Sequence, residues 1–291
     1  MPGHFIDLHS HTNESDGSLT PEELVALAKQ TGLGALAITD HDTFDGYRKA
    51  IPSARIAGLD LLQGIELNTR FYPDGEVNGH LRSVHLLAYF LSGEPSGVFE
   101  EWLAEQREER RSRNRKLANS LRARGVEITF EEVEARGKSL AGRPHFASIL
   151  MEKGYAKDFR DAFTRYLGEE APGFVQRESK TTEETIQVVR QGGGIPVIAH
   201  PIRIGLHEHQ EREALQAWKA AGLVGMEVYH SEHSAERQAY YRQLAEEFQL
   251  LPTGGSDFHG TIKPTVELGS GISGNVRVPR QVLDRLRAFV Q

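Results

Sequence analysis

Histidine and carboxylate side chains recur where short apolar runs of this 291-residue chain end. His9 and His11 close the first run as His-Ser-His, and residues i and i+2 of an extended segment point to the same side. Both imidazoles can therefore bind a single cation. The same residue types occur at the ends of four further runs, and His85 lies within another, which gives nine candidate metal ligands: His9, His11, Asp16, His41, Glu66, His85, His200, Asp257 and His259.

The types of these side chains indicate the chemistry of the site. Imidazole together with carboxylate suits Zn, Mn or Fe, and the absence of Cys removes any bias toward soft metals. The three carboxylates, Asp16, Glu66 and Asp257, would repel one another without bound cations. Two or three ions about 3.5–4 Å apart are a common means of hydrolysing phosphate esters, because they hold the attacking and leaving oxygens.

Bringing nine ligands together requires a regular scaffold. Strands that alternate with helices predict a parallel sheet, and seven or eight such units usually close into a barrel whose strand ends meet on one face. The helix after the first strand has Thr20 as its expected N-cap and Pro21 at its first position. Seven candidate strands alternate with helical spacing, at residues 5–9, 35–39, 61–66, 83–90, 195–199, 226–229 and 251–253.

The alternation stops between residues 92 and 181, where the sequence has helical character throughout. A long charged stretch, 100–124, ends at Gly125, and shorter helical stretches end before Gly154 and Gly168. We therefore predict an α/β chain in two parts. Residues 1–91 and 182–291 would form the catalytic barrel, and residues 92–181 an all-helical insertion that caps the substrate site.

Composition excludes several classes of protein. The absence of Cys excludes a disulfide framework, Cys-ligated zinc, iron–sulfur clusters and thiol catalysis. No apolar run approaches the ~20 residues that span a bilayer, and the first residues lack the basic and apolar segments of a secretion signal. A net charge of −7 argues against bulk nucleic-acid binding. We expect a cytoplasmic protein that needs neither a membrane nor an obligate protein partner.

A series of motifs in this order resembles those of the PHP phosphoesterase family. They are Asp7-Leu-His-Ser-His-Thr, Ser15-Asp16-Gly17, Thr39-Asp40-His41-Asp42, Gly64-Ile65-Glu66, Ala199-His200-Pro201 and Gly255-Ser256-Asp257-Phe258-His259. The resemblance covers residues 5 to about 260. It implies the PHP fold, a distorted seven-stranded (β/α) barrel, with two to three divalent ions. Mn is the first expectation, with Zn or Fe as alternatives.

The resemblance also implies how the ligands are shared. His80 competes with His85 because residues 76–81 could form a loop that reaches the site, but Val84-His85-Leu86-Leu87 resembles the family's His-bearing strand. One ion would be held by His9, His11, Glu66 and Asp257, a second by Glu66, His85 and His200, and a third by Asp16, His41 and His259.

The catalytic group in this interpretation is a metal-bound hydroxide, which attacks phosphorus without a protein nucleophile. Asp40 is adjacent to the ligand His41 and could orient an imidazole from outside the ligand set. The alternative is that Asp40 only caps a turn or a helix.

Residues of the insertion resemble a subgroup of this family, the 3′,5′-nucleoside bisphosphate phosphatases, some of which also trim RNA 5′ ends. Arg143 and His145 open a helix there and are our candidates for phosphate binding, since a guanidinium binds phosphate bidentately and a helix N-terminus favours anions. A surface position is the alternative for Arg143. His233, after the sixth strand, is a further candidate for substrate contact. Val175-Gln176-Arg177 departs from the subgroup pattern.

Seven basic residues and no acidic residue occur between Arg110 and Arg124. Such a segment is either a solvated helix face balanced by the preceding glutamates, or a basic wall along which an RNA end approaches the site.

Together these features predict a metal-dependent phosphoric monoester hydrolase. Its expected substrate is the 3′-phosphate of nucleoside 3′,5′-bisphosphates, with 5′-3′ exoribonuclease action on short RNA as an additional activity and inorganic phosphate as product. One alternative is a phosphatase for another small phosphomonoester such as histidinol phosphate, although such a substrate needs no helical wall. The other is a non-catalytic metal-binding PHP module, although all nine ligand positions are filled.

Overall fold

The computed structural model describes residues 4–75 and 81–290 of the chain. Its centre is an eight-stranded sheet with the order β7-β6-β5-β4-β3-β2-β1-β8. The strands are β1 (Phe5–Asp7), β2 (Ala35–Ile38), β3 (Asp60–Phe71), β4 (Arg82–Phe90), β5 (Ile195–Ile198), β6 (Gly225–His230), β7 (Leu251–Gly255) and β8 (Val278–Pro279).

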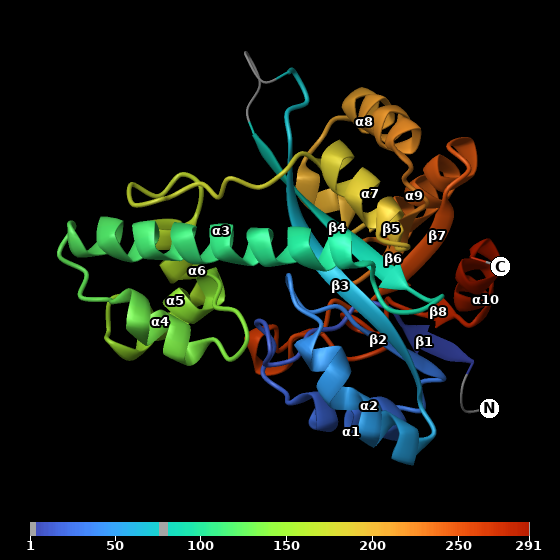
Figure 1. Cartoon of the computed structure of the whole chain (residues 1–291), viewed down its shortest axis with the longest axis horizontal. Coiled ribbons are helices and arrows are strands. Elements are labelled where there is room, and N and C mark those ends of the chain that lie inside the picture. Colours follow the sequence, from blue (N-terminus) through green and yellow to red (C-terminus); the bar gives the residue numbers. More distant parts are fainter. Residues whose placement is uncertain (1–3, 76–80, 291) are drawn as a thin grey trace.

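Helices cover both sides of this sheet (Figure 1). The helices α1 and α2 lie on one side of it, and α7, α8 and α9 lie on the other. They are α1 (Pro21–Gln30), α2 (Asp45–Ala57), α3 (Gly97–Arg122), α4 (Phe130–Arg136), α5 (Arg143–Glu152), α6 (Phe159–Ala162), α7 (Thr182–Gln191), α8 (Glu208–Ala221), α9 (Ala235–Glu247) and α10 (Gln281–Phe289).

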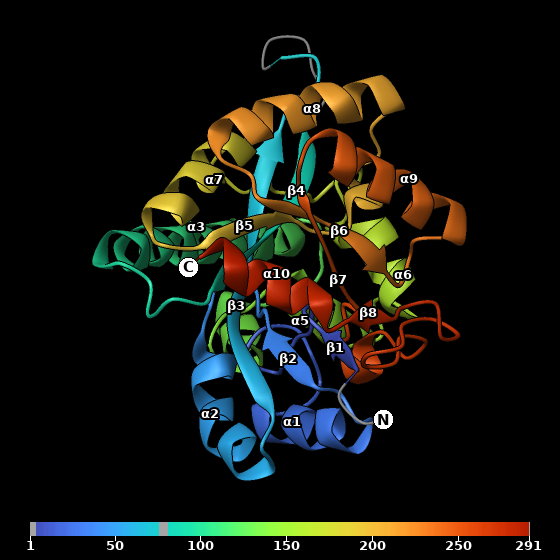
Figure 2. The same ribbon diagram turned by 90° about the vertical axis from the view of Figure 1, so that its right-hand side faces the viewer.

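The sheet closes where β1 meets β7. The Leu8 amide donates to the carbonyl oxygen of Gly254 at 3.3 Å, and beyond the strands the Asp257 amide donates to the carbonyl oxygen of His9 at 2.8 Å. Gly255 permits this approach, because a Cβ there would collide with the backbone of His9. Figure 2 shows α10 lying across one end of the resulting barrel. The predicted α/β barrel is thus confirmed.

The prediction that all strands run parallel is wrong. β4 is antiparallel to both β3 and β5, and β8 is antiparallel to β1. Parallel neighbours need a crossover, usually a helix, whereas β3 and β4 are joined directly through residues 72–81 and pair from Gln63–Phe90 to Phe71–Arg82. The eighth strand was not predicted because its two residues are too short for a periodic pattern.

The helices α3 to α6 form an arm beside the barrel (Figure 1). They enclose a hydrophobic core of their own, which includes Leu121, Val133, Phe146 and Leu150. After α6 the chain continues into a π-helical turn at Phe163–Leu167. The arm therefore packs around its own apolar contacts, and its α4 helix was not predicted.

Local capping fixes the first helix as the sequence predicts. The Thr20 hydroxyl accepts a hydrogen bond from the Glu23 amide at 3.2 Å, and the Glu23 carboxylate accepts one from the Thr20 amide at 2.8 Å. This capping box holds the start of α1 directly after the loop that carries Asp16. No helix in the described ranges is long and apolar enough to cross a membrane.

Candidate active site

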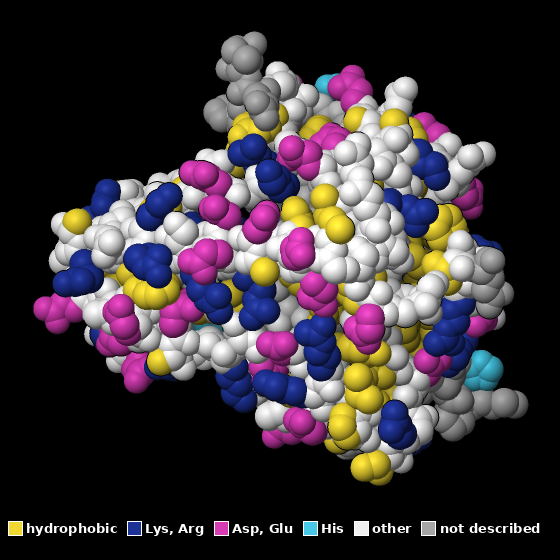
Figure 3. Space-filling model, in the orientation of Figure 1, with side chains coloured by type: hydrophobic (Ala, Val, Ile, Leu, Met, Phe, Trp, Pro, Cys, Tyr) yellow, Lys and Arg dark blue, Asp and Glu magenta, His cyan; other side chains and the backbone are white. Residues whose placement is uncertain are grey.

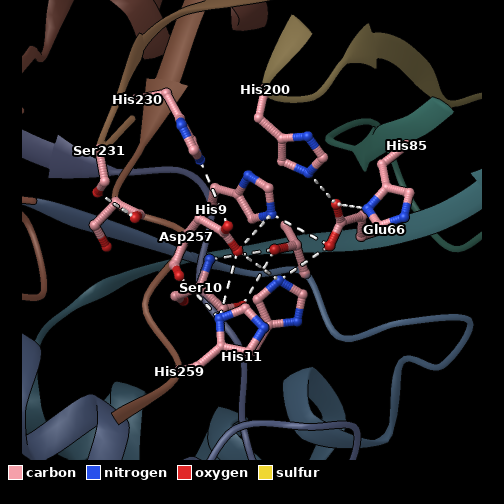
Figure 4. A network of polar contacts seen from close by, with 12 residues as sticks. His9, Ser10, His11, Glu66, His85, His200, His230, Ser231, Asp257 and His259 are labelled. Atoms are coloured by element: carbon pink, nitrogen blue, oxygen red, sulfur yellow. Dashed lines mark hydrogen bonds and ion pairs between the residues drawn. The ribbon is translucent and has the colours of Figure 1, made fainter. Parts of the chain in front are cut away.

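The Glu66 carboxylate lies at the centre of the predicted ligand cluster (Figure 4). Its Oε1 atom is 2.8 Å from His85 Nδ1 and 2.9 Å from His200 Nε2. The competing candidate His80 lies outside the described residues. The other oxygen, Oε2, is 3.1–3.4 Å from one ring nitrogen of each of three further imidazoles, those of His9, His11 and His41.

Two more carboxylates complete the cluster. Asp257 Oδ1 is 3.4–3.5 Å from ring nitrogens of His9, His11 and His259. Asp16 is 3.4 Å from His259, 3.5 Å from His11 and 3.6 Å from His41. All nine predicted ligands are therefore brought together. Three groups among them have the spacing of a metal site: His9, His11, Glu66 and Asp257; His11, Asp16, His41 and His259; and His41, Glu66 and His85.

Negative charge dominates the electrostatics of the cluster. Burial by itself lowers the pKa of His9, yet Glu227, Glu66 and Asp257 drive that pKa well above its ordinary value. The pKa of His11 is likewise raised to about 9, because its contacts with Asp257 and Glu66 outweigh burial. The carboxylates therefore favour positive charge beside these two imidazoles, which a bound cation can supply.

Several imidazole nitrogens in the cluster have no hydrogen-bond partner in the described part of the chain. Among the nine predicted ligands they are the buried His9 Nε2, His11 Nε2, His41 Nδ1 and His200 Nδ1. A buried polar atom without a partner is costly, whereas a nitrogen lone pair that faces a carboxylate is an available metal ligand. Burial also lowers the pKa of His41 to about 3, which favours the neutral, ligating form. The residues present therefore fit divalent cations.

Glu227 in β6 orients this cluster and was not predicted. Its Oε1 is 3.1 Å from His9 Nδ1, and its Oε2 accepts a hydrogen bond from the His200 amide at 2.7 Å. A carboxylate on one imidazole nitrogen fixes the ring so that the other nitrogen can ligate a metal. The signal in the sequence was a charged residue inside an otherwise apolar strand, where Glu227 is fully buried.

Asp40 has a different role from either alternative given above. It accepts hydrogen bonds from the Thr12 amide at 2.8 Å, from the Thr12 hydroxyl at 2.6 Å and from the Ser15 hydroxyl at 2.6 Å. These bonds fix the loop that carries Asp16. In the described residues Asp40 neither bonds to an imidazole nor caps a helix.

Three residues of the site have left-handed backbones although none is glycine. They are Asp42 (φ 53°), His200 (φ 25°) and Asp257 (φ 57°), each at or after the end of a strand. Such conformations are uncommon for residues with a Cβ and concentrate at functional sites. Here they turn two predicted ligands, His200 and Asp257, toward Glu66 and the His9–His11 pair.

A cavity of about 420 Å³ extends from the ligand cluster to the helical arm. Its barrel side includes Asp16, His41, Glu66, His85, Asp257 and His259. Its arm side includes Arg110, Arg113, Arg143, Phe159, Phe163, Phe174 and Arg177. One continuous space is thus lined by acidic and imidazole groups at one end and by guanidinium and aromatic groups at the other.

The three predicted substrate contacts differ in position. Arg143 lines the cavity, and its guanidinium carbon is 6.0 Å from the ring centres of both Phe163 and Phe174. His145 instead accepts a hydrogen bond from the Gly142 amide at 2.9 Å and so caps α5. His233 is fully buried, with Nδ1 2.8 Å from the Val228 carbonyl oxygen. In the described chain neither histidine lines the cavity.

Arginines outside the prediction also reach the cavity. Arg110 and Arg177 both donate to Asp42 Oδ2, at 2.6 and 2.7 Å, and so join the arm to the barrel. Arg177 belongs to the segment that departed from the subgroup pattern. Arg110 and Arg113 lie on α3 at the spacing of Leu117 and Leu121, and this shared helix face was the signal that could have identified them.

The other basic residues of α3 remain outside this face. Arg115, Lys116, Arg122 and Arg124 are exposed. Figure 3 shows Lys and Arg side chains interspersed with Asp and Glu on this side of the molecule. Two arginines of the basic segment, Arg110 and Arg113, thus line the cavity, and four of its basic residues form a solvated face. The approach of an RNA end along this segment stays a prediction.

Two further cations lie at the barrel end of the cavity. Asp257 Oδ2 is 2.9 Å from an Arg203 nitrogen and 2.7 Å from Lys263 Nζ. The same oxygen is 3.5 Å from Nε2 of the buried His230. Oδ1, which faces His9 and His11, is therefore left as the oxygen available to a metal.

Comparisons with known proteins agree with this geometry. The family model described as the PHP domain matches residues 7–167. A 3′,5′-nucleoside bisphosphate phosphatase from Chromobacterium violaceum is 32% identical over 87% of this chain and 87% of its own length. A 5′-3′ exoribonuclease from Haemophilus influenzae is 31% identical over 87% of this chain and 89% of its own.

Solved structures give the same result. A Chromobacterium violaceum amidohydrolase, solved with bound sulfate and no metal, has a TM-score of 0.82 and 29% identity, and the match covers 97% of this chain and 96% of that one. A structure from Bifidobacterium adolescentis has a TM-score of 0.82 and 31% identity, with 97% of this chain and 95% of that one covered. On its fold, its ligand cluster and these matches, the chain belongs to the PHP domain family of phosphoesterases.

Proposed function

We propose that this protein is a metal-dependent phosphatase that removes the 3′-phosphate of nucleoside 3′,5′-bisphosphates. The observation that carries the proposal is the single cavity that joins the ligand cluster to the arginines of the arm. Its volume of about 420 Å³ falls within the range of small-molecule sites, about 300–1,000 Å³. A substrate with two phosphates can engage both ends of this cavity at once.

The ligand cluster would hold two to three divalent ions, with Mn as the first candidate. His9, His11, Glu66 and Asp257 would hold one ion, and Asp16, His41 and His259 another. His85 and His200, which share one oxygen of Glu66, would hold a third. Bound ions supply Lewis-acid polarisation of the phosphoryl group and an acidified water as nucleophile.

The protein's own residues prepare this site for the reaction. Glu227 fixes the His9 ring, and Asp40 fixes the loop that carries Asp16. Arg203 and Lys263 line the cavity beside Asp257, where they can bind oxygens of the scissile phosphate as its charge develops. Orientation and charge stabilisation, without a covalent intermediate on the protein, are the expected sources of rate enhancement.

The arm end of the cavity supports a nucleotide as the substrate. Phe163 and Phe174 line it, and the centre of each ring is 6.0 Å from the Arg143 guanidinium carbon. Aromatic rings stack on nucleobases, and a guanidinium binds phosphate bidentately. Histidinol phosphate carries an imidazole but no second phosphate for these arginines.

A second candidate activity is 5′-3′ exoribonuclease action on short RNA. The 31% identity to an enzyme of that name supports it, as does the same cavity, because a 5′-phosphorylated RNA end carries the same two phosphates around its first nucleoside. The exposed basic residues of α3 could bind the following phosphates.

A substrate panel tests the proposal. The Mn-loaded protein would be assayed for phosphate release from adenosine 3′,5′-bisphosphate, adenosine 3′-monophosphate, adenosine 5′-monophosphate, histidinol phosphate and p-nitrophenyl phosphate, with a 5′-phosphorylated RNA oligomer as a further sample. The bisphosphate should give the highest kcat/KM among the small substrates. A preference for histidinol phosphate, or no release from any of them, would contradict the proposal.

A further inference from the structure

Arg113 in α3 is a buried cation without a partner. It is 7% exposed, and its Nε atom is buried with no hydrogen-bond acceptor. Within the described residues no carboxylate forms an ion pair with it, and it lines the cavity. A buried charge that has no partner is strongly destabilising, so its retention needs a reason other than stability.

Two of the neighbouring arginines have a carboxylate partner, whereas Arg113 has none among the described residues. Arg110 and Arg177 both bind Asp42 Oδ2, at 2.6 and 2.7 Å. Arg143 donates a hydrogen bond to the Leu167 carbonyl oxygen at 3.4 Å, and Glu169 lines the same cavity. Burial and repulsion from Arg110, Arg143 and Arg177 lower the pKa of Arg113 well below its ordinary value, and Asp42 offsets only part of this effect.

The charge of this cluster defines what it can bind. Four guanidinium groups gather around Asp42, with Glu169 near Arg143 and Glu109 near Arg177, so the arginines outnumber the carboxylates that act on them. A phosphate monoester carries close to two negative charges near neutral pH. Its oxygens accept hydrogen bonds from a planar guanidinium in a bidentate manner, and such bonds are among the strongest in proteins.

We infer that Arg113, with Arg143 beside it, forms a subsite for the phosphate that is not hydrolysed. This inference rests on the proposed function and identifies the residues that distinguish the two phosphates of the substrate. The metal-ligand cluster takes the scissile phosphate. The arginine subsite takes the retained phosphate, which is the 5′-phosphate of a nucleoside 3′,5′-bisphosphate or of an RNA end.

The Asp42 carboxylate gives this subsite its shape. By holding Arg110 and Arg177 through one oxygen, Asp42 fixes two guanidiniums of the cluster and leaves the charge of Arg113 free for the ligand. Asp42 itself is 1% exposed and belongs to the barrel, so the subsite lies where the arm contacts the barrel. A phosphate bound there would lie in the same cavity as the metal ligands.

The test compares the two reaction products as inhibitors. Hydrolysis of p-nitrophenyl phosphate by the Mn-loaded protein would be inhibited by adenosine 5′-monophosphate, which presents the retained phosphate, and separately by inorganic phosphate. Arg113→Met should raise the inhibition constant of adenosine 5′-monophosphate about tenfold to a hundredfold, the effect of losing a charge-assisted contact. The constant for inorganic phosphate should change less than about twofold.

Thermal unfolding without ligand provides the second readout. Because Arg113→Met removes an uncompensated charge, it should leave the melting temperature unchanged or raise it, whereas loss of a structural arginine would lower it. Arg113→Lys, which keeps the charge but not the fork, should give an intermediate inhibition constant. Arg115→Met is the matched control on the same helix, since Arg115 is exposed and lies 4.5 Å from the Phe130 ring centre.

The outcomes separate this inference from the proposed function. An unchanged inhibition constant for adenosine 5′-monophosphate in Arg113→Met, or an equal rise for both products, would overturn the subsite. If the wild-type protein hydrolysed no phosphomonoester, the proposed function would fail. In that case calorimetry would test whether adenosine 5′-monophosphate still binds. Binding to the wild type and to Arg115→Met, but not to Arg113→Met, would support the subsite. No binding to the wild type would overturn the subsite.

Discussion

The two ends of the cavity carry buried charges of opposite sign. At the barrel end three carboxylates, those of Asp16, Glu66 and Asp257, are surrounded by imidazoles, and in the described residues only Asp257 pairs with Lys or Arg side chains. At the arm end four arginines surround one buried carboxylate and lack anions. At each end the protein's own charges do not balance. Each end is complementary to one part of a metal-bound bisphosphate. Uncompensated buried charge therefore identifies ligand sites in this protein.

The two ends also differ in how they are supported. The barrel end rests on strand ends joined by backbone hydrogen bonds, such as that from the His11 amide to the Phe258 carbonyl oxygen at 2.9 Å. The arm end reaches the barrel through side chains, chiefly Asp42 with Arg110 and Arg177, and through Ser139, which donates to Glu14 at 2.5 Å. We expect substitutions at the barrel end to abolish the reaction and those at the arm end to change its substrate preference.

The largest effect is expected for Glu66→Gln. Five imidazoles surround this carboxylate, so removing its charge should abolish binding of more than one ion. Turnover should fall by roughly 10³-fold or more, because a catalytic metal contributes several kcal/mol and each 1.4 kcal/mol is tenfold. Elemental analysis and kcat with added Mn check this. The exposed Glu22→Gln is the control, and near-normal metal content in Glu66→Gln would show that Glu66 is not a shared ligand.

A smaller loss at the same end is expected for Glu227→Gln. The amide still fills the space beside His9 Nδ1 but no longer raises the basicity of that imidazole. Loss of such an orienting carboxylate typically costs 10- to 100-fold in metal affinity or activity. Mn titration by calorimetry should show weaker binding with unchanged stoichiometry. Wild-type affinity in this variant would separate Glu227 from the metal site.

At the arm end Arg143→Ala should change substrate preference and spare the basic reaction. Losing a charge-assisted phosphate contact costs about 1.5–3 kcal/mol, or roughly ten- to more than a hundredfold in kcat/KM on adenosine 3′,5′-bisphosphate. Hydrolysis of p-nitrophenyl phosphate should change little. Equal losses of kcat/KM on both substrates would instead assign Arg143 to the scissile phosphate. No loss on either substrate would show that Arg143 does not contact the substrate.

The smallest effect is expected far from the cavity, at Asp60. This carboxylate at the start of β3 is 2.7 Å from Arg280 and 2.8 Å from Arg287. Although burial opposes it, the two arginines lower the pKa of Asp60. The stabilisation is therefore present above the unfolded pKa of about 3.9 and lost as the pH falls through the lower folded pKa.

Asp60→Asn should accordingly lower the free energy of unfolding at pH 7 by about 0.5–1 kcal/mol, because the partners are part-exposed and screened. The difference in free energy of unfolding between Asp60→Asn and the wild type should become smaller below about pH 4. The kcat of the variant should equal that of the wild type. Urea unfolding at pH 7 and pH 3 measures both expectations. A loss of activity in Asp60→Asn would contradict the assignment of Asp60 to stability alone, apart from the charged residues that bind ligands.

The sequence predicts the barrel end well because its information is local. All the ligands except His85 follow a short apolar run, and the ends of neighbouring strands are adjacent in any such barrel. His41 and Asp257 could therefore be placed together although they lie 216 positions apart in the sequence. The direction of β4 was missed although a signal was present, because Pro73-Asp74-Gly75 is a turn sequence and the ten residues 72–81 contain no helical pattern for a crossover.

The arm end depends on contacts that no local pattern reveals. Asp42 meets Arg177 only because the chain returns from the arm past the barrel, and nothing around either residue indicates the pairing. For His145 and His233 the sequence context suggested substrate contact. In the structure His145 accepts a helix-capping hydrogen bond, and His233 is buried. Specificity residues were thus harder to predict than metal ligands.

The most direct test of this account identifies which phosphate is removed. The Mn-loaded protein would be incubated with adenosine 3′,5′-bisphosphate, and the nucleoside product would be separated by chromatography and assigned by phosphorus NMR. If the ligand cluster takes the 3′-phosphate and the arginines retain the 5′-phosphate, the products are adenosine 5′-monophosphate and inorganic phosphate. Formation of adenosine 3′-monophosphate would contradict this assignment of the two ends.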